Sequence, residues 1–295
     1  MAAPRAILFD EASTPASAAG PAPLVWWLHI PKCGSSFKAS VNMYTTDPAR
    51  GGGTHAIFPA DASAEEVGEV VTMFRAPKQR LMSMFEYMRR DVTFNAQGKP
   101  EFYGAGLSWG WNGSERQRVR MAIYNNGSIA DTLGPFIGCQ ANAVLGHRCL
   151  GRVDYGMPPE EVAKRAIERL KRFRFYGLES EWTLSICLFN YLMSGKRYVT
   201  RGQLVNTRPN DVAAAAASVY NETGVPDDPI DDPLYEYVEA SFHEQLRTHG
   251  ISEEACPDYT DGVPEAARFD SMANSLRVLP RAAGPPMRSA DFEET

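Results

Sequence analysis

The sequence predicts an α/β domain with a mostly parallel sheet flanked by helices. Two short apolar runs, 24–30 and 70–74, each end at a turn signal and lead into a stretch with helical periodicity. A third strand-like run at 173–177 lies between helical patterns at about 159–172 and 180–194. Strands that alternate with helices are typical of parallel sheets covered by helices, in which ligands bind at the carboxyl ends of the strands.

The composition indicates one globular domain with irregular ends. The chain has 295 residues, of which 44% are hydrophobic, and its net charge of −6 does not suggest a nucleic-acid partner. Residues 1–23 are rich in Ala, Pro and Ser, and residues 261–295 show little periodicity, so we expect a disordered segment and a flexible tail around a domain at 24–260. A helix at 231–249 is expected to close this domain. No run approaches the ~20 apolar residues of a membrane helix.

The end of the first predicted strand carries the strongest functional signal. After Ile30 the chain reads Pro-Lys-Cys-Gly-Ser-Ser-Phe, and an amphipathic stretch at 34–44 predicts a helix. The unpaired N–H groups and the dipole at a helix start can bind a phosphate, and Lys32 adds a full positive charge. The loop is not a Walker A loop, because the chain contains no G-x-x-x-x-G-K-[S/T] sequence.

This strand, loop and helix start resemble the 5′-phosphosulfate loop of sulfotransferases, whose donor is 3′-phosphoadenosine 5′-phosphosulfate (PAPS). In the carbohydrate branch of that family the loop reads much like His-Ile-Pro-Lys-x-Gly-x-Ser-Phe. The residues that match are His29, Ile30, Pro31, Lys32, Gly34, Ser36 and Phe37. The resemblance implies a P-loop-like, three-layer fold in which donor contacts come from the loop residues Lys32, Cys33, Gly34, Ser35, Ser36 and Phe37. His29 is expected to be structural.

A second segment makes the resemblance more specific. Arg75 follows the predicted strand 70–74, and Ser83 lies eight residues further, about two turns into a helix predicted at 77–90. The family's 3′-phosphate site pairs an Arg at a strand end with a Ser on the next helix at this spacing. A guanidinium binds phosphate oxygens with two parallel hydrogen bonds, and a hydroxyl adds one more. The family usually has Asp after the Arg, whereas this chain has Ala76.

The same resemblance suggests the catalytic residues. Sulfuryl transfer needs charge neutralisation at the leaving phosphate, and Lys32 is placed for it. A hydroxyl acceptor also needs a base, and His55 is the first candidate, because a His in the corresponding stretch is the base in heparan and related uronyl sulfotransferases. Glu86 is a weaker candidate. Arg208 falls where the family closes a loop over the donor, and no metal is expected.

The acceptor is expected to be a carbohydrate or another hydroxyl compound, bound in part by the long polar and aromatic loop at 91–115. Glycan-modifying members of the family are usually Golgi proteins with an N-terminal anchor. As given, the sequence has no apolar signal-peptide core and is expected to be soluble, with the Golgi lumen implied if an anchor is missing. Cys139 and Cys149 either form a disulfide or are two buried thiols.

Two other functions remain open at this stage. One is a nucleotide kinase or another NTPase of the same general architecture, which the absence of a Walker A loop speaks against. The other is a non-catalytic member of the fold that binds only donor or glycan, which the change to Ala76 allows. Acceptor identity and oligomeric state do not follow from the sequence.

Overall fold

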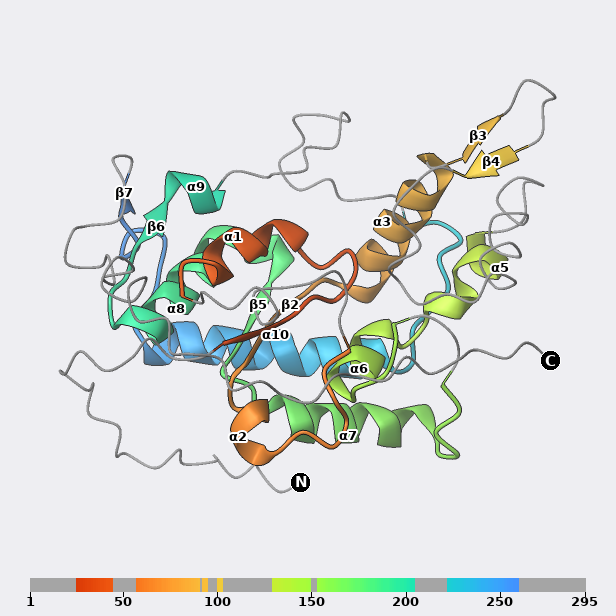
Figure 1. Ribbon diagram of the computed structural model, residues 1–295, viewed down its shortest axis with the longest axis horizontal. Helices are drawn as coiled ribbons and strands as arrows, with labels where there is room; N and C mark the ends of the chain where they lie inside the picture. Colours follow the sequence, from red (N-terminus) through yellow and green to blue (C-terminus); the bar gives the residue numbers. More distant parts are fainter. Residues whose placement is uncertain are drawn as a thin grey trace, which may run out of the picture. The chain divides into compact units, whose positions relative to one another are not determined.

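The computed structural model describes residues 25–44, 57–90, 92–94, 100–102, 129–149, 153–204 and 222–259. Its main sheet has three parallel strands in the order β1 (Trp26–Leu28), β2 (Val70–Phe74) and β5 (Phe175–Leu178). Trp26 pairs with Val70, and Phe74 pairs with Leu178. Because parallel strands end at the same edge, the segments that follow these three strands lie near one another (Figure 1).

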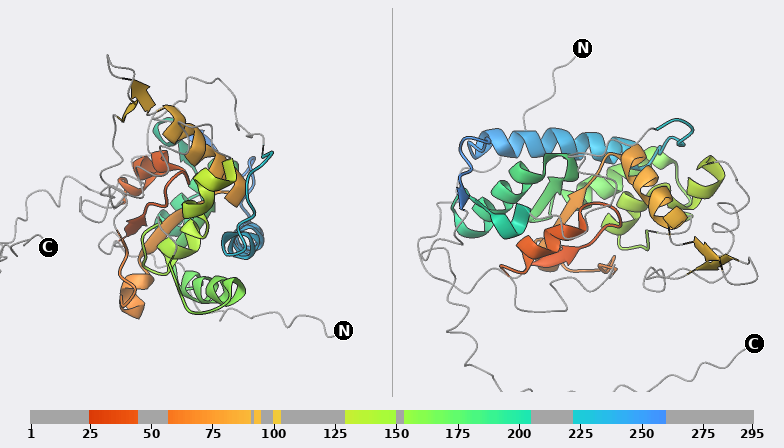
Figure 2. Two further views of the ribbon diagram at one scale, coloured as in Figure 1. Left: turned by 90° about the vertical axis from the view of Figure 1, so that its right-hand side faces the viewer. Right: turned by 90° about the horizontal axis from the view of Figure 1, so that it is seen from above.

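Helices flank the sheet and connect its strands (Figures 1 and 2). After β1 come a 3-10 turn, η1 (Ser35–Phe37), and two short helices, α1 (Lys38–Val41) and α2 (Ala64–Val67). After β2 comes α3 (Pro77–Arg90), which leads into an antiparallel hairpin of β3 (Val92–Phe94) and β4 (Pro100–Phe102). The elements that follow before β5 are α5 (Ile129–Leu133), η3 (Gly134–Phe136), α6 (Cys139–Val144) and α7 (Pro159–Leu170).

The C-terminal part of the fold is mainly helical. After β5 come η4 (Glu179–Glu181) and α8 (Trp182–Ser194), then β6 (Val199–Thr200) and α9 (Arg201–Leu204). Helix α10 (Asp231–Thr248) is followed by β7 (Asp258–Tyr259), which pairs with β6 in parallel. The long helix α10 lies beside α7 and also contacts β5, α3, α6 and α8, so it connects most parts of the domain.

The core explains why the strands form where they do. All five residues of β2, the central strand, and all four of β5 are buried, as expected for a parallel sheet covered on both faces. The side chain of Phe37 joins them from the loop after β1. Its ring centroid lies 5.0 Å from that of Phe189 on α8 and 5.5 Å from that of Phe175 on β5. The Lys32 loop is therefore anchored in the same core as the sheet.

The predicted α/β class and the parallel sheet are confirmed. The strand at 70–74 and the helix at 77–90 have the predicted bounds, while the strand predicted at 24–30 is shorter. The helix predicted at 34–44 is instead a 3-10 turn followed by the four-residue α1. This segment begins at a left-handed Gly34 with no side-chain cap and contains Ser and Val, which are weaker helix formers than Ala or Leu.

Candidate functional site

The loop after β1 has an unusual backbone. Lys32 has φ 68° and Gly34 has φ 77°, and both values lie in the left-handed region. Such a conformation costs roughly 1–2 kcal/mol for a residue with a Cβ, so Lys32 needs support from its surroundings. The Cys33 amide donates a hydrogen bond to the Ile30 carbonyl at 3.2 Å and closes the turn. The loop therefore presents Lys32 in one defined backbone conformation.

Gly34 is required at its position for two reasons. Its positive φ disfavours any other residue, and a Cβ there would lie 2.8 Å from Cζ3 of Trp182. Trp182 begins α8 and donates a hydrogen bond from Nε1 to the Gln203 carbonyl at 3.1 Å. The indole is thus fixed and cannot easily move away from an added side chain.

The residues around Gly34 divide into anchors and exposed positions. Cys33 and Phe37 are fully buried, and the Phe37 amide donates a hydrogen bond to the Gly34 carbonyl at 3.0 Å. Lys32, Gly34, Ser35 and Ser36 are only partly buried. Of the six loop residues predicted to contact the donor, these four lie nearer the surface, whereas the side chains of Cys33 and Phe37 point into the core.

Arg75 follows β2, and β2 pairs with β1, the strand that precedes the Lys32 loop. Its side chain is 12% exposed, and its Nε lies 3.4 Å from Oε2 of Glu179. Glu179 follows β5 directly, so the ion pair joins the ends of two neighbouring strands. A Cβ added at Gly34 would lie 3.8 Å from Cγ of Glu179, so the glycine is close to this side chain. The structure therefore brings the Lys32 loop, Arg75 and Glu179 together.

Helix α3, which begins just after Arg75, carries Ser83 and Tyr87. Ser83, predicted to bind the 3′-phosphate, lies on α3 and is only 4% exposed. Tyr87 lies four residues further, and the Lys32 ammonium is 4.6 Å from the centre of its ring, within the range of a cation–π interaction. Lys32, which is expected to neutralise the charge on the leaving phosphate, is thus positioned in part by an aromatic side chain.

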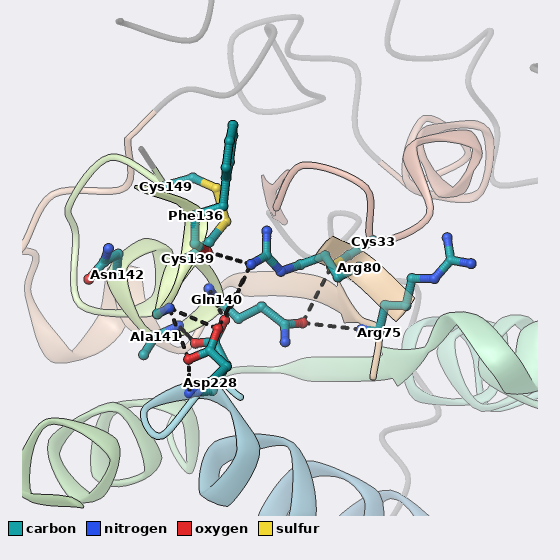
Figure 3. The surroundings of a disulfide bond; sticks show 12 residues. Cys33, Arg75, Arg80, Phe136, Cys139, Gln140, Ala141, Asn142, Cys149 and Asp228 are labelled. Carbon is teal, nitrogen blue, oxygen red and sulfur yellow. Dashed lines mark hydrogen bonds and ion pairs between the residues drawn. A yellow bond between two sulfur atoms is a disulfide. The ribbon is translucent and has the colours of Figure 1, made fainter. Parts of the chain in front are cut away.

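Gln140, on α6, connects the Lys32 loop to the residue that follows β2, Arg75 (Figure 3). Its Oε1 accepts a hydrogen bond from the Cys33 thiol at 3.3 Å and another from the Arg75 backbone N–H at 3.1 Å. Burial raises the pKa of Cys33 to about 12, so the thiol remains protonated near neutral pH and can donate. This protonation also argues against Cys33 as a nucleophile.

A buried ionic cluster supports α6 in turn. Arg80, Asp228 and Asp231 are fully buried. The Arg80 Nη2 donates to the Phe136 carbonyl at 2.6 Å and lies 3.8 Å from the Asp231 carboxylate and 4.0 Å from that of Asp228. Burial, and the neighbouring charge of Asp228, raise the pKa of Asp231 to about 8.

The two carboxylates of this cluster cap the start of α6. Asp228 accepts from the Gly138 amide at 2.9 Å, and Asp231 accepts from the amides of Gln140 and Ala141, both at 2.9 Å. These are amides at the helix start, which have no partner inside the helix. Because Gly138 has a left-handed conformation and provides no side-chain cap, distant residues supply the acceptors.

Two disulfides are present. Cys139 and Cys149, for which the sequence allowed either a disulfide or two buried thiols, form a disulfide, and this bond fixes the start of α6. Cys187–Cys256 links α8 to the segment before β7 and was not anticipated, because its partners lie 69 residues apart. Cys33 is the free cysteine.

Several predicted residues lie outside the described residues. They include His55, Arg208 and most of the loop at 91–115. Glu86 is partly buried on α3, and His243 forms a 2.6 Å contact between its Nε2 and Oε1 of Glu181. Glu179, Tyr87 and Gln140 were not predicted. Of these, Glu179 had a sequence signal, because it stands at the end of a predicted strand.

The described ranges contain no cluster of three or more His, Cys, Asp or Glu residues suited to a metal ion. No helix in the same part of the chain has both the length and the apolar character needed to cross a bilayer. The chain matches no known protein-family model, and no curated protein is significantly similar to it.

Proposed function

We propose that this protein is a PAPS-dependent sulfotransferase that transfers a sulfuryl group to a hydroxyl, most simply on a carbohydrate. One observation carries the proposal. The Lys32 loop and Arg75, which resemble the two donor-binding motifs of that family, follow neighbouring parallel strands and lie at one edge of the sheet. In open α/β sheets this edge is where ligands bind.

Two groups of residues are suited to the two phosphates of the donor. The Ser35 and Ser36 segment, ahead of the first 3-10 hydrogen bond, is suited to the 5′-phosphate. Arg75 and Ser83 are suited to the 3′-phosphate, and a guanidinium that is 12% exposed offers strong, weakly screened hydrogen bonds. The closing contact from Arg208 rests on the sequence resemblance alone.

The reaction requires an in-line transfer. The bond between sulfur and the phosphate oxygen of PAPS breaks while a bond between sulfur and the acceptor oxygen forms. The acceptor proton goes to a base, for which His55 is the candidate, and the negative charge that develops on the leaving phosphate is stabilised by Lys32. Catalysis would then depend mainly on position and electrostatics, by analogy with phosphoryl transfer.

The two disulfides also agree with this proposal. Disulfides persist mainly in oxidising compartments, which include the secretory pathway. A location in the Golgi lumen, where family members modify glycans, is therefore part of the proposal.

The test is calorimetric titration of the protein with adenosine 3′,5′-bisphosphate and, separately, with ATP plus Mg²⁺. Micromolar binding of the bisphosphate together with weak binding of ATP is the expected result. Preferential binding and turnover of Mg²⁺-ATP would instead indicate an NTPase. Bisphosphate binding without sulfuryl transfer to any glycan or small alcohol would indicate a non-catalytic binding protein.

A further inference from the structure

We propose that Gln140 is a positioning residue that holds the Lys32 loop and the end of β2 in fixed relation through a single amide oxygen. The structural part of this inference stands alone, and its consequence for donor binding rests on the proposed function. Cys33 and Arg75 are far apart in the chain, and Gln140 is 107 residues from the first and 65 from the second, yet its Oε1 contacts both.

The orientation of the Gln140 amide follows from its neighbours. The Arg75 backbone N–H is always a donor, and the Cys33 thiol is kept protonated by burial, so the atom between them must be the oxygen. The side chain is fully buried, so water does not compete for this oxygen.

The backbone of Gln140 is fixed as well. Its own amide donates to Asp231 at 2.9 Å, and the preceding residue, Cys139, is held by the disulfide to Cys149. Asp231 belongs to α10 and lies 3.8 Å from Arg80 of α3. The two loops are therefore connected, through Gln140, to a rigid buried cluster rather than to a mobile surface side chain.

Gln140 is an unfavourable choice for stability alone. Its Nε2 is buried and has no hydrogen-bond partner among the described residues. An unpaired buried donor is destabilising, whereas an apolar residue of similar length would avoid that cost. A role for the oxygen in aligning the two loops accounts for a polar residue at this position.

The first test needs no ligand. Cys33 is the only thiol, because the other four of the five cysteines form the two disulfides. Gln140→Leu removes the acceptor of both hydrogen bonds. The infrared S–H stretching band of Cys33 should therefore shift to higher wavenumber, and hydrogen exchange at the Arg75 backbone amide should accelerate. Gln140→Met, which keeps the length and replaces the amide oxygen by a thioether sulfur that accepts only weakly, is a second variant should the first fold poorly. An unchanged band and unchanged exchange would overturn the proposal.

The matched control is Asn142→Leu. Asn142 is another buried amide of α6, and its Oδ1 accepts a hydrogen bond from Tyr155 at 2.6 Å, away from the two loops. It should leave the S–H band and the Arg75 exchange unchanged, although it removes a comparable buried group. Equal shifts in both variants would show a general loosening of α6 and would overturn the specific role of Gln140.

The second test measures the dissociation constant for adenosine 3′,5′-bisphosphate. It should rise about tenfold in Gln140→Leu and stay within about twofold in Asn142→Leu. If the wild-type protein binds the bisphosphate and Gln140→Leu binds it equally well, Gln140 does not position the donor site. If the wild-type protein does not bind it, the proposed function fails, and the ligand-free measurements still decide whether Gln140 couples the loops.

Discussion

Arg75 and Arg80 are five residues apart, yet they serve two different regions of the molecule. Arg75 lies at the sheet edge, with a side chain 12% exposed and one carboxylate near its Nε. Arg80 is fully buried between two carboxylates and a carbonyl oxygen. The first arginine is partly exposed and pairs with a carboxylate at the sheet edge, whereas the second lies wholly inside the protein. Residue type therefore says little about role until burial and partners are known.

The largest effect is expected from Arg80→Met. The substitution leaves Asp228 and Asp231 buried without their cation, which typically costs about 3–5 kcal/mol of unfolding free energy. Urea denaturation measures the loss directly. A decrease below about 1 kcal/mol would show that the Arg80 cluster does not support the fold and would remove the contrast between the two arginines.

Arg75→Ala should have the opposite profile. We expect bisphosphate affinity to fall about a hundredfold, because charged hydrogen bonds to phosphate are lost, while unfolding free energy changes little. Calorimetric titration measures the affinity, and Arg172→Ala, at an exposed arginine after α7, is the matched control. Binding that survives Arg75→Ala would refute the assignment of Arg75 to the 3′-phosphate.

The pH dependence of stability should also trace to the buried cluster. The pKa of Asp231 is about 8 in the folded protein, well above its ordinary value of 3.8. Between these values the folded state holds a proton that the unfolded state has released, so stability should fall as pH rises from 5 to 8, by up to about 1.4 kcal/mol per pH unit.

Asp231→Asn should flatten this slope, because the titrating group is gone. Urea denaturation at several pH values measures it, with Glu236→Gln, at an exposed carboxylate on the same helix, as the control. A slope that persists unchanged in Asp231→Asn would assign the proton to another group.

The smallest effect is expected from Glu179→Gln. The Glu179 carboxylate pairs with Arg75 and would repel a phosphate bound there, so its neutralisation should tighten bisphosphate binding about two- to fivefold. Glu181→Gln is the control, because Glu181 instead contacts His243. Weaker binding in Glu179→Gln would mean that the carboxylate orients Arg75 more than it repels the ligand.

The sequence was most informative where interactions are local. The strand at 70–74 and the helix at 77–90 follow from a compact apolar run, a helix-starting proline and regular periodicity, and the structure has both at the predicted bounds. The helix predicted at 34–44 was wrong in form, because the apolar pattern there reflects Phe37 entering the core from a loop rather than a continuous helix.

The candidate site follows the same division. Lys32, Gly34 and Arg75 could be identified from the sequence because they follow predicted strands. Glu179 also follows a predicted strand, but no role was predicted for it. Gln140 carried no such signal. Its oxygen serves two residues that are far from it in the chain, and nothing in Cys-Gln-Ala-Asn indicates which distant groups it will meet.

The sequence by itself determined the α/β class, the order along the chain of the three sheet strands and of the long helices α3, α7, α8 and α10, and the presence of a basic, glycine-containing loop, because periodicity and turn residues act over a few neighbouring positions. Only the tertiary structure decided that Arg80 is fully buried while Arg75 stays partly exposed, that Cys139 pairs with Cys149 and Cys187 with Cys256, and that Gln140 joins two loops. These outcomes depend on contacts between residues far apart in the chain, which form only when the parallel strands and α10 are packed together.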